Sequence, residues 1–248
     1  MHAATAHAPL DLTIRSMTAA ASLRVGGLTR LTSIDYPGEL AAVIFCQGCA
    51  WRCCYCHNQD LLDPDAETMI SWAEIMDFLS QRRELLDAVV FSGGEPTTQH
   101  ALVAAMSEVR SLGFKIGLHT NGAYPERLGR LLPLLDWVGL DIKALPADYH
   151  GITAVADSGR AAWQSLSVLL NSTVALEVRT TLMPHWTPAQ IAALAHHLAD
   201  LGVTSYSLQA CDTDHAFDPH LPRNPYPLTA LTAQIDTSRF IRFTTRGI

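Results

Sequence analysis

Three closely spaced cysteines constrain this chain more than any other feature. Cys49, Cys53 and Cys56 follow the spacing C-x3-C-x2-C, and five of the six cysteines in the 248-residue chain fall between residues 46 and 56. A [4Fe-4S] cubane held only by protein takes four thiolates, so three thiolates leave one iron open to a ligand that is not protein. A reaction could take place at an iron that has such an open coordination position.

Three other uses of these cysteines stay open at this point. Structural zinc usually takes four protein ligands in paired groups, and no second pair follows downstream. A disulfide framework is disfavoured, because adjacent Cys53 and Cys54 are awkward to bridge and a chain with 48% apolar residues needs no such cross-links. Cys46 offers a fourth thiol, which would suit a ferredoxin-like electron carrier.

Polar residues follow the ends of several short apolar runs. In sheets built from βα units, the carboxyl ends of the parallel strands lie together at one side of the sheet, and ligands bind there. The polar segments are Ser92-Gly93-Gly94-Glu95-Pro96, His119-Thr120-Asn121-Gly122, Asp141-Ile142-Lys143 and Arg179-Thr180-Thr181.

The alternation of strand and helix patterns predicts an α/β fold, a partial (βα)6 TIM-like barrel open on one side. We expect helices over 71–79, 98–111, 125–134, 159–170 and 187–200, with Ser71 as an N-cap, between strands near 41–45, 88, 115, 136, 174 and 204. The barrel domain would span residues 23–215. Residues 1–22, with His2 and His7, are expected to be a flexible extension, and residues 216–248 an irregular C-terminal extension.

Two groups of motifs resemble a known family. Cys49-x3-Cys53-x-Tyr55-Cys56 followed by Gly93-Gly94-Glu95-Pro96 resembles the radical S-adenosylmethionine (SAM) superfamily. Segments 27–30, 33–38, 47–49 and 55–58 are similar to activating proteins of glycyl-radical enzymes, closest to the anaerobic ribonucleoside-triphosphate reductase activating protein. The resemblance covers about residues 25–210. Cys54, where proline is common in the family, and the extra Cys46 depart from its pattern.

This resemblance implies the cofactors and a role for each motif residue. Cys49, Cys53 and Cys56 would hold three irons of a [4Fe-4S] cluster, and the amino and carboxylate groups of SAM would chelate the fourth. Gly93 and Gly94 would let the backbone approach the methionyl group, and Glu95 would accept a hydrogen bond from its ammonium. The other implied cofactor contacts are Tyr55 near the adenine, Asn121, Asp141, Lys143 and Arg179 at the ribose and carboxylate, and, more weakly, Leu208 as an adenine wall.

The resemblance also implies an activity. An external donor of flavodoxin or ferredoxin type would reduce the cluster, SAM would be cleaved to methionine and a 5′-deoxyadenosyl radical, and this radical would take a hydrogen atom from a glycine of a partner glycyl-radical enzyme. Two alternatives stay open. One is a radical SAM enzyme acting on a small molecule, such as a 7-deazapurine precursor, and the other is a non-catalytic iron–sulfur carrier that uses Cys46.

Composition narrows the partners and the compartment. A formal charge of −7 and a pI near 5.8 disfavour a nucleic-acid partner, which usually leaves a basic signature. No apolar run reaches the length of a membrane span, and we expect no membrane partner. Clustered thiols without export features predict a reducing, anaerobic site in the cytoplasm, because oxygen would destroy such a cluster.

Overall fold

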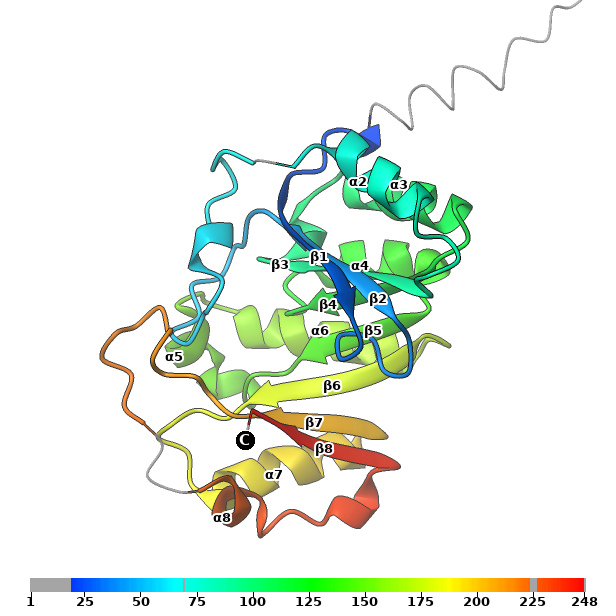
Figure 1. Ribbon diagram of the computed structural model, residues 1–248. Helices are drawn as coiled ribbons and strands as arrows, with labels where there is room; N and C mark the ends of the chain where they lie inside the picture. The colour runs from blue at the N-terminus through cyan, green and yellow to red at the C-terminus, as the bar shows by residue number, and fades with distance from the viewer. Residues whose placement is uncertain (1–18, 69, 224–226, 248) are drawn as a thin grey trace, which may run out of the picture.

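An eight-stranded sheet organises the structure, a computed structural model that describes residues 19–68, 70–223 and 227–247 (Figure 1). The strands lie in chain order, β1 pairs antiparallel with β2, and β2 to β8 are all parallel. The strands are β1 (Val25–Thr32), β2 (Ala41–Cys46), β3 (Ala88–Gly93), β4 (Lys115–Thr120), β5 (Trp137–Asp141), β6 (Ala175–Thr181), β7 (Ser205–Gln209) and β8 (Arg242–Arg246). The predicted α/β partial barrel is confirmed, its six expected strands being β2 to β7.

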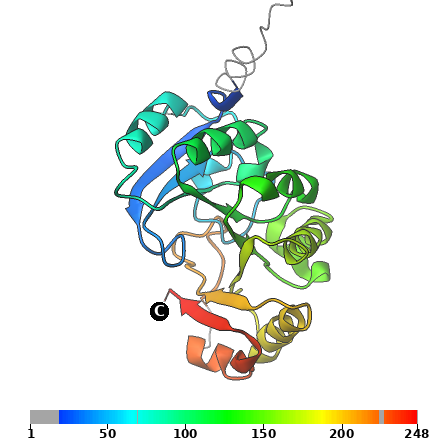
Figure 2. The same ribbon diagram turned by 90° about the vertical axis from the view of Figure 1, so that its right-hand side faces the viewer.

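Helices connect the parallel strands and lie along the outer side of the curved sheet (Figures 1 and 2). The α-helices are α2 (Trp72–Ser80), α3 (Leu102–Ser111), α4 (Pro125–Leu131), α5 (Tyr149–Thr153), α6 (Ser158–Leu170), α7 (Pro188–Asp200) and α8 (Leu228–Thr232). The 3-10 turns are η1 (Gln59–Leu61), η2 (Pro96–Thr98), η3 (Leu132–Leu134), η4 (Pro146–Asp148) and η5 (Thr237–Arg239).

Local sequence explains where two of these helices begin. Ser71 caps α2 as predicted, in a capping box with Glu74. The helix expected from residue 98 begins only at Leu102, because residues 96–98 form the 3-10 turn η2 and the backbone of Gln99 after it is extended, with φ −91° and ψ 126°. The Gln99 side chain donates to the backbone carbonyls of Arg24 and Gln47. This contact ties the start of α3 to the segment that precedes the three cysteines.

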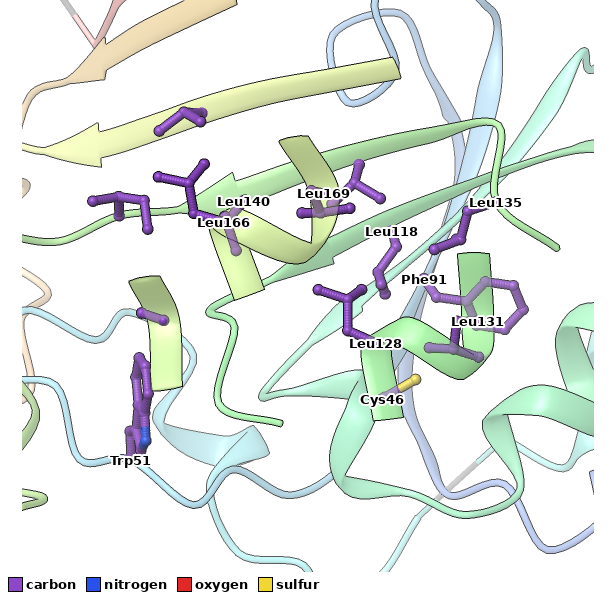
Figure 3. Packing of buried hydrophobic residues seen from close by; sticks show 14 of the residues in the cluster. Cys46, Trp51, Phe91, Leu118, Leu128, Leu131, Leu135, Leu140, Leu166 and Leu169 are labelled. Atoms are coloured by element: carbon purple, nitrogen blue, oxygen red, sulfur yellow. The ribbon is translucent and has the colours of Figure 1, made fainter. Parts of the chain in front are cut away.

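Alternating side chains on each strand divide the interior into two clusters. On β2, Ala42 and Ile44 face the helices and join the main core, whereas Val43 and Phe45 face the inside of the barrel. Figure 3 shows part of the main core, where a fully buried side chain such as Phe91 contributes about 1.5–3 kcal/mol.

The turn between β1 and β2 fills the amino end of the barrel interior. Tyr36 from this turn packs on Trp137 with ring centroids 5.2 Å apart, and the Asp35 carbonyl accepts a hydrogen bond from His119 Nε2 at 2.9 Å. Because this end is filled, space for a ligand is left at the carboxyl ends of the strands.

The C-terminal part differs from its prediction. Residues 216–248 were expected to be irregular, but they contain α8 and β8, and β8 extends the sheet by pairing with β7. Arg-Phe-Thr-Thr-Arg is a short, mostly polar strand, so its pattern gave little hydrophobic signal. Of the expected N-terminal extension, residues 1–18, with His2 and His7, lie outside the described residues, and Ala20 is fully buried. No helix in the described ranges is long and apolar enough to cross a membrane.

Candidate functional site

A cavity of about 400 Å³ lies at the carboxyl ends of the strands. It falls within the size range of small-molecule and cofactor sites. Ten of the eleven residues predicted for the site line it, namely Cys49, Cys53, Tyr55, Cys56, Gly93, Gly94, Asn121, Asp141, Lys143 and Arg179. The fold therefore brings together predicted residues that are up to 130 positions apart in the sequence, from 49 to 179.

The loop that carries the three cysteines is held by backbone hydrogen bonds at both ends. Gly48 and Cys49 donate to the carbonyls of Leu61 and Leu62 at 2.8 and 3.1 Å. The amides of Arg52 and Cys54 donate to carbonyls in α5 at 3.0 and 2.9 Å. The short helix α5, which was not predicted, thus acts as a support for the cysteine loop.

The three thiols of the loop line one cavity. Within the described ranges, no three His, Cys, Asp or Glu side chains come close enough to hold one metal ion. A [4Fe-4S] cubane with three protein ligands takes one thiolate on each of three separate irons. Burial raises the pKa of Cys49 to about 12 and also raises that of Cys53, so both thiols carry protons at neutral pH and would release them on binding iron.

Asn121 lies beside one of these sulfurs. Its Oδ1 accepts from the Ala123 amide at 2.9 Å, and this bond orients Nδ2 toward Cys49 Sγ at 3.6 Å. A donor aimed at a cluster sulfur is one of the means by which proteins tune cluster potential.

Cys46 does not reach the cavity. It is the last residue of β2, is fully buried, and faces the helices in the main core (Figure 3). Burial raises its pKa, as expected for an inert packed thiol. The alternative in which Cys46 is a fourth cluster ligand therefore finds no support in the geometry.

The two glycines line the cavity, but protein packing is what requires them. Gly93 has φ +119°, and a Cβ there would lie 2.4 Å from the backbone N and O of Cys46. A Cβ on Gly94 would lie 2.4 Å from the Gly48 carbonyl oxygen. Their lack of a side chain therefore lets the β3 end pack against the cysteine loop. The expectation that they also make room for the methionyl group stays a prediction.

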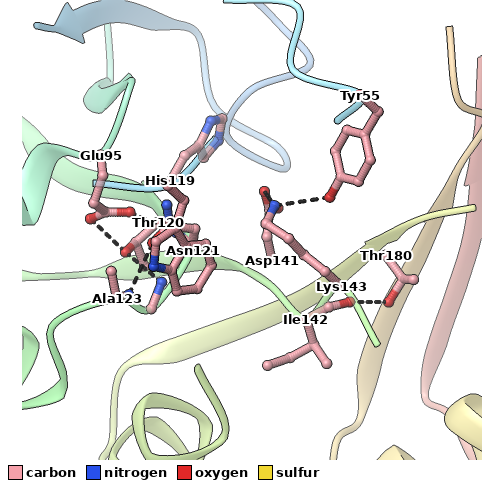
Figure 4. Close-up of polar contacts among 12 residues, drawn as sticks. Tyr55, Glu95, His119, Thr120, Asn121, Ala123, Asp141, Ile142, Lys143 and Thr180 are labelled. Carbon is pink, nitrogen blue, oxygen red and sulfur yellow. Dashed lines mark hydrogen bonds and ion pairs between the residues drawn. The ribbon is translucent and has the colours of Figure 1, made fainter. Parts of the chain in front are cut away.

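Glu95 is the predicted site residue that the structure does not bring to the cavity. It is fully buried, and its carboxylate accepts hydrogen bonds from the Thr97 amide and hydroxyl, the Thr120 hydroxyl at 2.8 Å and the Asn121 amide at 2.7 Å (Figure 4). Burial raises its pKa, and these hydrogen bonds oppose that shift. In this arrangement Glu95 holds the ends of β3 and β4 together.

Lys143 joins β5 to the cysteine loop. Its Nζ donates to Tyr55 Oη at 2.9 Å and lies 3.3 Å from Asp141 Oδ2 (Figure 4). Burial alone would lower the pKa of Lys143, but Tyr55 and Asp141 outweigh it and raise this pKa well above its usual value. The lysine is therefore charged, and the predicted Asp141–Lys143 pair does face one side of the strand.

Arg179 is buried in the cavity wall and lies over the Trp137 ring at 5.1 Å. Its Nε donates to Glu177 at 2.8 Å, and its Nη2 has no partner among the described residues. Leu208, the weaker candidate for the adenine wall, faces the helices in the main core instead, so that expectation was wrong.

Several cavity residues were missed by sequence reasoning. His119 and Ser92 share the inner face with the predicted residues, and the strand alternation could have found them. Gln209, Ala210, Arg246 and Gly247 come from the β7 and β8 ends, and β8 was not predicted at all.

Comparison with known proteins identifies the family. The family model described as the radical SAM superfamily matches residues 43–198. This chain belongs to the radical SAM superfamily. A protein of Methanocaldococcus jannaschii named as a glycyl-radical enzyme activating enzyme is 30% identical over 214 residues, which cover 82% of this chain and 86% of that protein. The pyruvate formate-lyase 1-activating enzyme of Escherichia coli K12 is 28% identical over 189 residues, 72% of this chain and 76% of that protein.

The fold comparison agrees. Streptococcus suis SuiB, solved with bound SAM, superposes on 81% of this chain with a TM-score of 0.63 and 14% identity, and this chain spans about half, 48%, of SuiB. As a radical SAM enzyme, the chain uses a [4Fe-4S] cluster and SAM as its cofactors. The three cysteines lie on one loop that α5 supports and line one cavity, an arrangement that fits a cluster with SAM bound beside it.

Proposed function

We propose that this radical SAM enzyme cleaves SAM reductively and installs a glycyl radical on a partner enzyme, as an activating enzyme of the anaerobic ribonucleotide reductase type. The observation that carries the proposal is the combination of the three-cysteine cavity with 30% identity along 86% of a relative named as a glycyl-radical enzyme activating enzyme. Both the motif residues and nearly the whole chain length support the same activity.

The chain's own residues have separable tasks in this proposal. Cys49, Cys53 and Cys56 would hold the cluster and leave one iron for SAM, and Asn121 would donate to the Cys49 sulfur. Lys143, charged and fixed by Tyr55, would contact the ribose or the carboxylate of SAM. When bound, the two cofactors supply the one-electron cleavage that yields methionine and a 5′-deoxyadenosyl radical.

The open sheet supports a polypeptide substrate. In the described strand order β1 and β8 are the two edges and do not pair, so the barrel is not closed on that side. A glycine on a partner loop could approach the cavity from there, and the cavity wall would keep water from the reacting carbon. A donor of flavodoxin or ferredoxin type remains our prediction for the electron source.

The test is anaerobic and needs the partner. Protein reconstituted with iron and sulfide is reduced, supplied with SAM, and mixed with the anaerobic ribonucleoside-triphosphate reductase of the same source. We expect a glycyl radical in the electron paramagnetic resonance spectrum of the reductase, lost when its acceptor glycine is replaced by alanine. Efficient formation of 5′-deoxyadenosine with no radical on any glycyl-radical enzyme, but consumption of a purine precursor, would favour the small-molecule alternative.

A further inference from the structure

One sulfur of the cysteine loop receives two hydrogen-bond donors. The Trp51 amide donates to Cys49 Sγ at 3.4 Å, and Asn121 Nδ2 donates to the same atom at 3.6 Å. In the part of the chain that the structure describes, no such bond reaches the sulfur of Cys53 or Cys56. The three thiols of the loop are therefore not equivalent, and Cys49 is the one whose sulfur the protein surrounds with N–H groups.

The Asn121 side chain is fixed by the backbone around it (Figure 4). Asn121 is buried, its Oδ1 accepts from the Ala123 amide at 2.9 Å, and its own amide donates to Glu95 at 2.7 Å. Because Oδ1 is used by a backbone donor, the NH2 end of the side chain is the one that faces Cys49. The turn after β4 thus holds an N–H donor at the sulfur before any cofactor binds.

A donor at a cluster sulfur favours the reduced state of the cluster. One-electron reduction adds one negative charge, which the sulfur ligands share, and no bond forms or breaks. An N–H group interacts more strongly with the more negative state, and it does so most strongly in a buried site where water does not screen it. Hydrogen bonds to the sulfurs are among the factors that set the reduction potential of such clusters. The Trp51 donor is a backbone amide, so Asn121 is the donor that a side-chain substitution can remove.

We propose that Asn121 is a positioning residue for the reduction step: through the Cys49 sulfur, it raises the reduction potential of the cluster held by the three cysteines. This role takes the place of the sequence-based expectation that Asn121 contacts the ribose or the carboxylate of SAM. The proposal rests on the part of the proposed function that makes Cys49 a cluster ligand. It holds whichever substrate the 5′-deoxyadenosyl radical attacks.

Two substitutions separate the donor at the sulfur from the turn that holds it. Asn121→Ser and Asn121→Asp both keep an oxygen that can accept from the Ala123 amide, and neither has an NH2 group to offer Cys49. Asn58→Ala is the matched control. Asn58 lines the same cavity, but its side chain donates to the Gly93 carbonyl at 3.5 Å and not to a sulfur.

The test is a redox titration of the reconstituted holoenzyme without SAM or a partner enzyme. Each variant is loaded with iron and sulfide, titrated anaerobically with dithionite, and its reduced cluster is measured by electron paramagnetic resonance. Asn121→Ser should shift the reduction equilibrium about tenfold toward the oxidised cluster, which lowers the potential by about 59 mV for one electron. Asn121→Asp should lower it further, because it places a carboxylate oxygen beside the sulfur. Asn58→Ala should keep the wild-type potential. A wild-type potential in Asn121→Ser at full cluster occupancy would overturn the proposal.

SAM affinity separates this role from direct contact with the cofactor. Asn121→Ser should bind SAM within about twofold of the wild type, and a tenfold loss at unchanged potential would assign Asn121 to SAM and overturn the proposal. The proposal would also be overturned if neither Asn121 variant held a cluster that Asn58→Ala holds, because Asn121 would then serve cluster assembly. A lowered potential in Asn121→Ser, when the wild type forms no glycyl radical, would retain the role of Asn121 and reject the proposed function. Glycyl-radical formation by the wild type with no change of potential in Asn121→Ser would do the reverse.

Discussion

Lys143 Nζ lies 2.9 Å from Tyr55 Oη, and this hydrogen bond fastens the end of β5 to the loop that carries the three cysteines. Both residues are buried in the cavity wall. The contact therefore couples two parts of the proposed cofactor site, and its energy can be measured without any cofactor.

A double-mutant cycle should reveal this coupling. Tyr55→Phe leaves the Lys143 ammonium short of a partner, and Lys143→Met leaves the Tyr55 hydroxyl buried without its donor. We expect each single change to destabilise the protein in urea unfolding, with a coupling energy of about 1–3 kcal/mol between them. Additive effects of the two changes would mean that the contact does not form in solution.

The cysteines should divide into two classes on reconstitution. Cys49→Ala, Cys53→Ala and Cys56→Ala should each lose the [4Fe-4S] absorption and most of the bound iron, because each removes one of three ligands. Cys46→Ala should retain the cluster and cost only roughly 1–2 kcal/mol of unfolding free energy, since it removes a packed sulfur from the core. Loss of the cluster in Cys46→Ala would instead show a fourth protein ligand and an electron carrier.

Glu95 provides a test between structural and cofactor-binding roles. In the wild-type protein the Glu95 carboxylate accepts hydrogen bonds from hydroxyl and backbone donors. Glu95→Gln replaces one carboxylate oxygen by an NH2 group, which cannot accept from these donors, and we expect a loss of about 2–3 kcal/mol in unfolding free energy. Chemical denaturation of the cofactor-free protein measures this directly. A variant of unchanged stability that binds SAM much more weakly would show that Glu95 serves the ammonium group of SAM.

His119 should make stability depend on pH. Its Nε2 donates to the Asp35 carbonyl and its Nδ1 accepts from Ser92, and burial, with Arg179 nearby, holds its pKa well below the usual 6.5. Below about pH 6.5 this histidine is protonated in the unfolded chain but stays neutral in the folded protein. The free energy of unfolding should therefore fall as pH drops below about 6.5, by at most about 1.4 kcal/mol per pH unit. His119→Gln should flatten this slope, measured by urea unfolding between pH 7.5 and about 5. The exposed His100→Gln is the control, and an equal slope in both variants would reject the argument.

Much of the fold and of the candidate site could be predicted from the sequence, because the polar site residues lie at or near the ends of apolar strands. Asn121, Asp141, Lys143 and Arg179 each come at or just after an apolar strand, and parallel strands gather such ends at one edge. The three cysteines needed no folding argument, since their spacing places them on one loop.

What sequence reasoning missed has physical causes. β8 is short and polar, so no hydrophobic period marked it, and Arg246 was lost with it. The burial of Glu95 and the outward direction of Cys46 and Leu208 depend on strand register, which motif spacing does not encode.

The most direct test of the account is whether SAM reacts at the cluster held by these three cysteines. The reconstituted protein is reduced anaerobically with SAM, and its products are measured by chromatography alongside the electron paramagnetic resonance spectrum of the cluster. We predict equal amounts of methionine and 5′-deoxyadenosine, and a cluster spectrum that changes when SAM is added. The account would be contradicted if the cluster were fully reduced, its spectrum were the same with and without SAM, and no 5′-deoxyadenosine were formed.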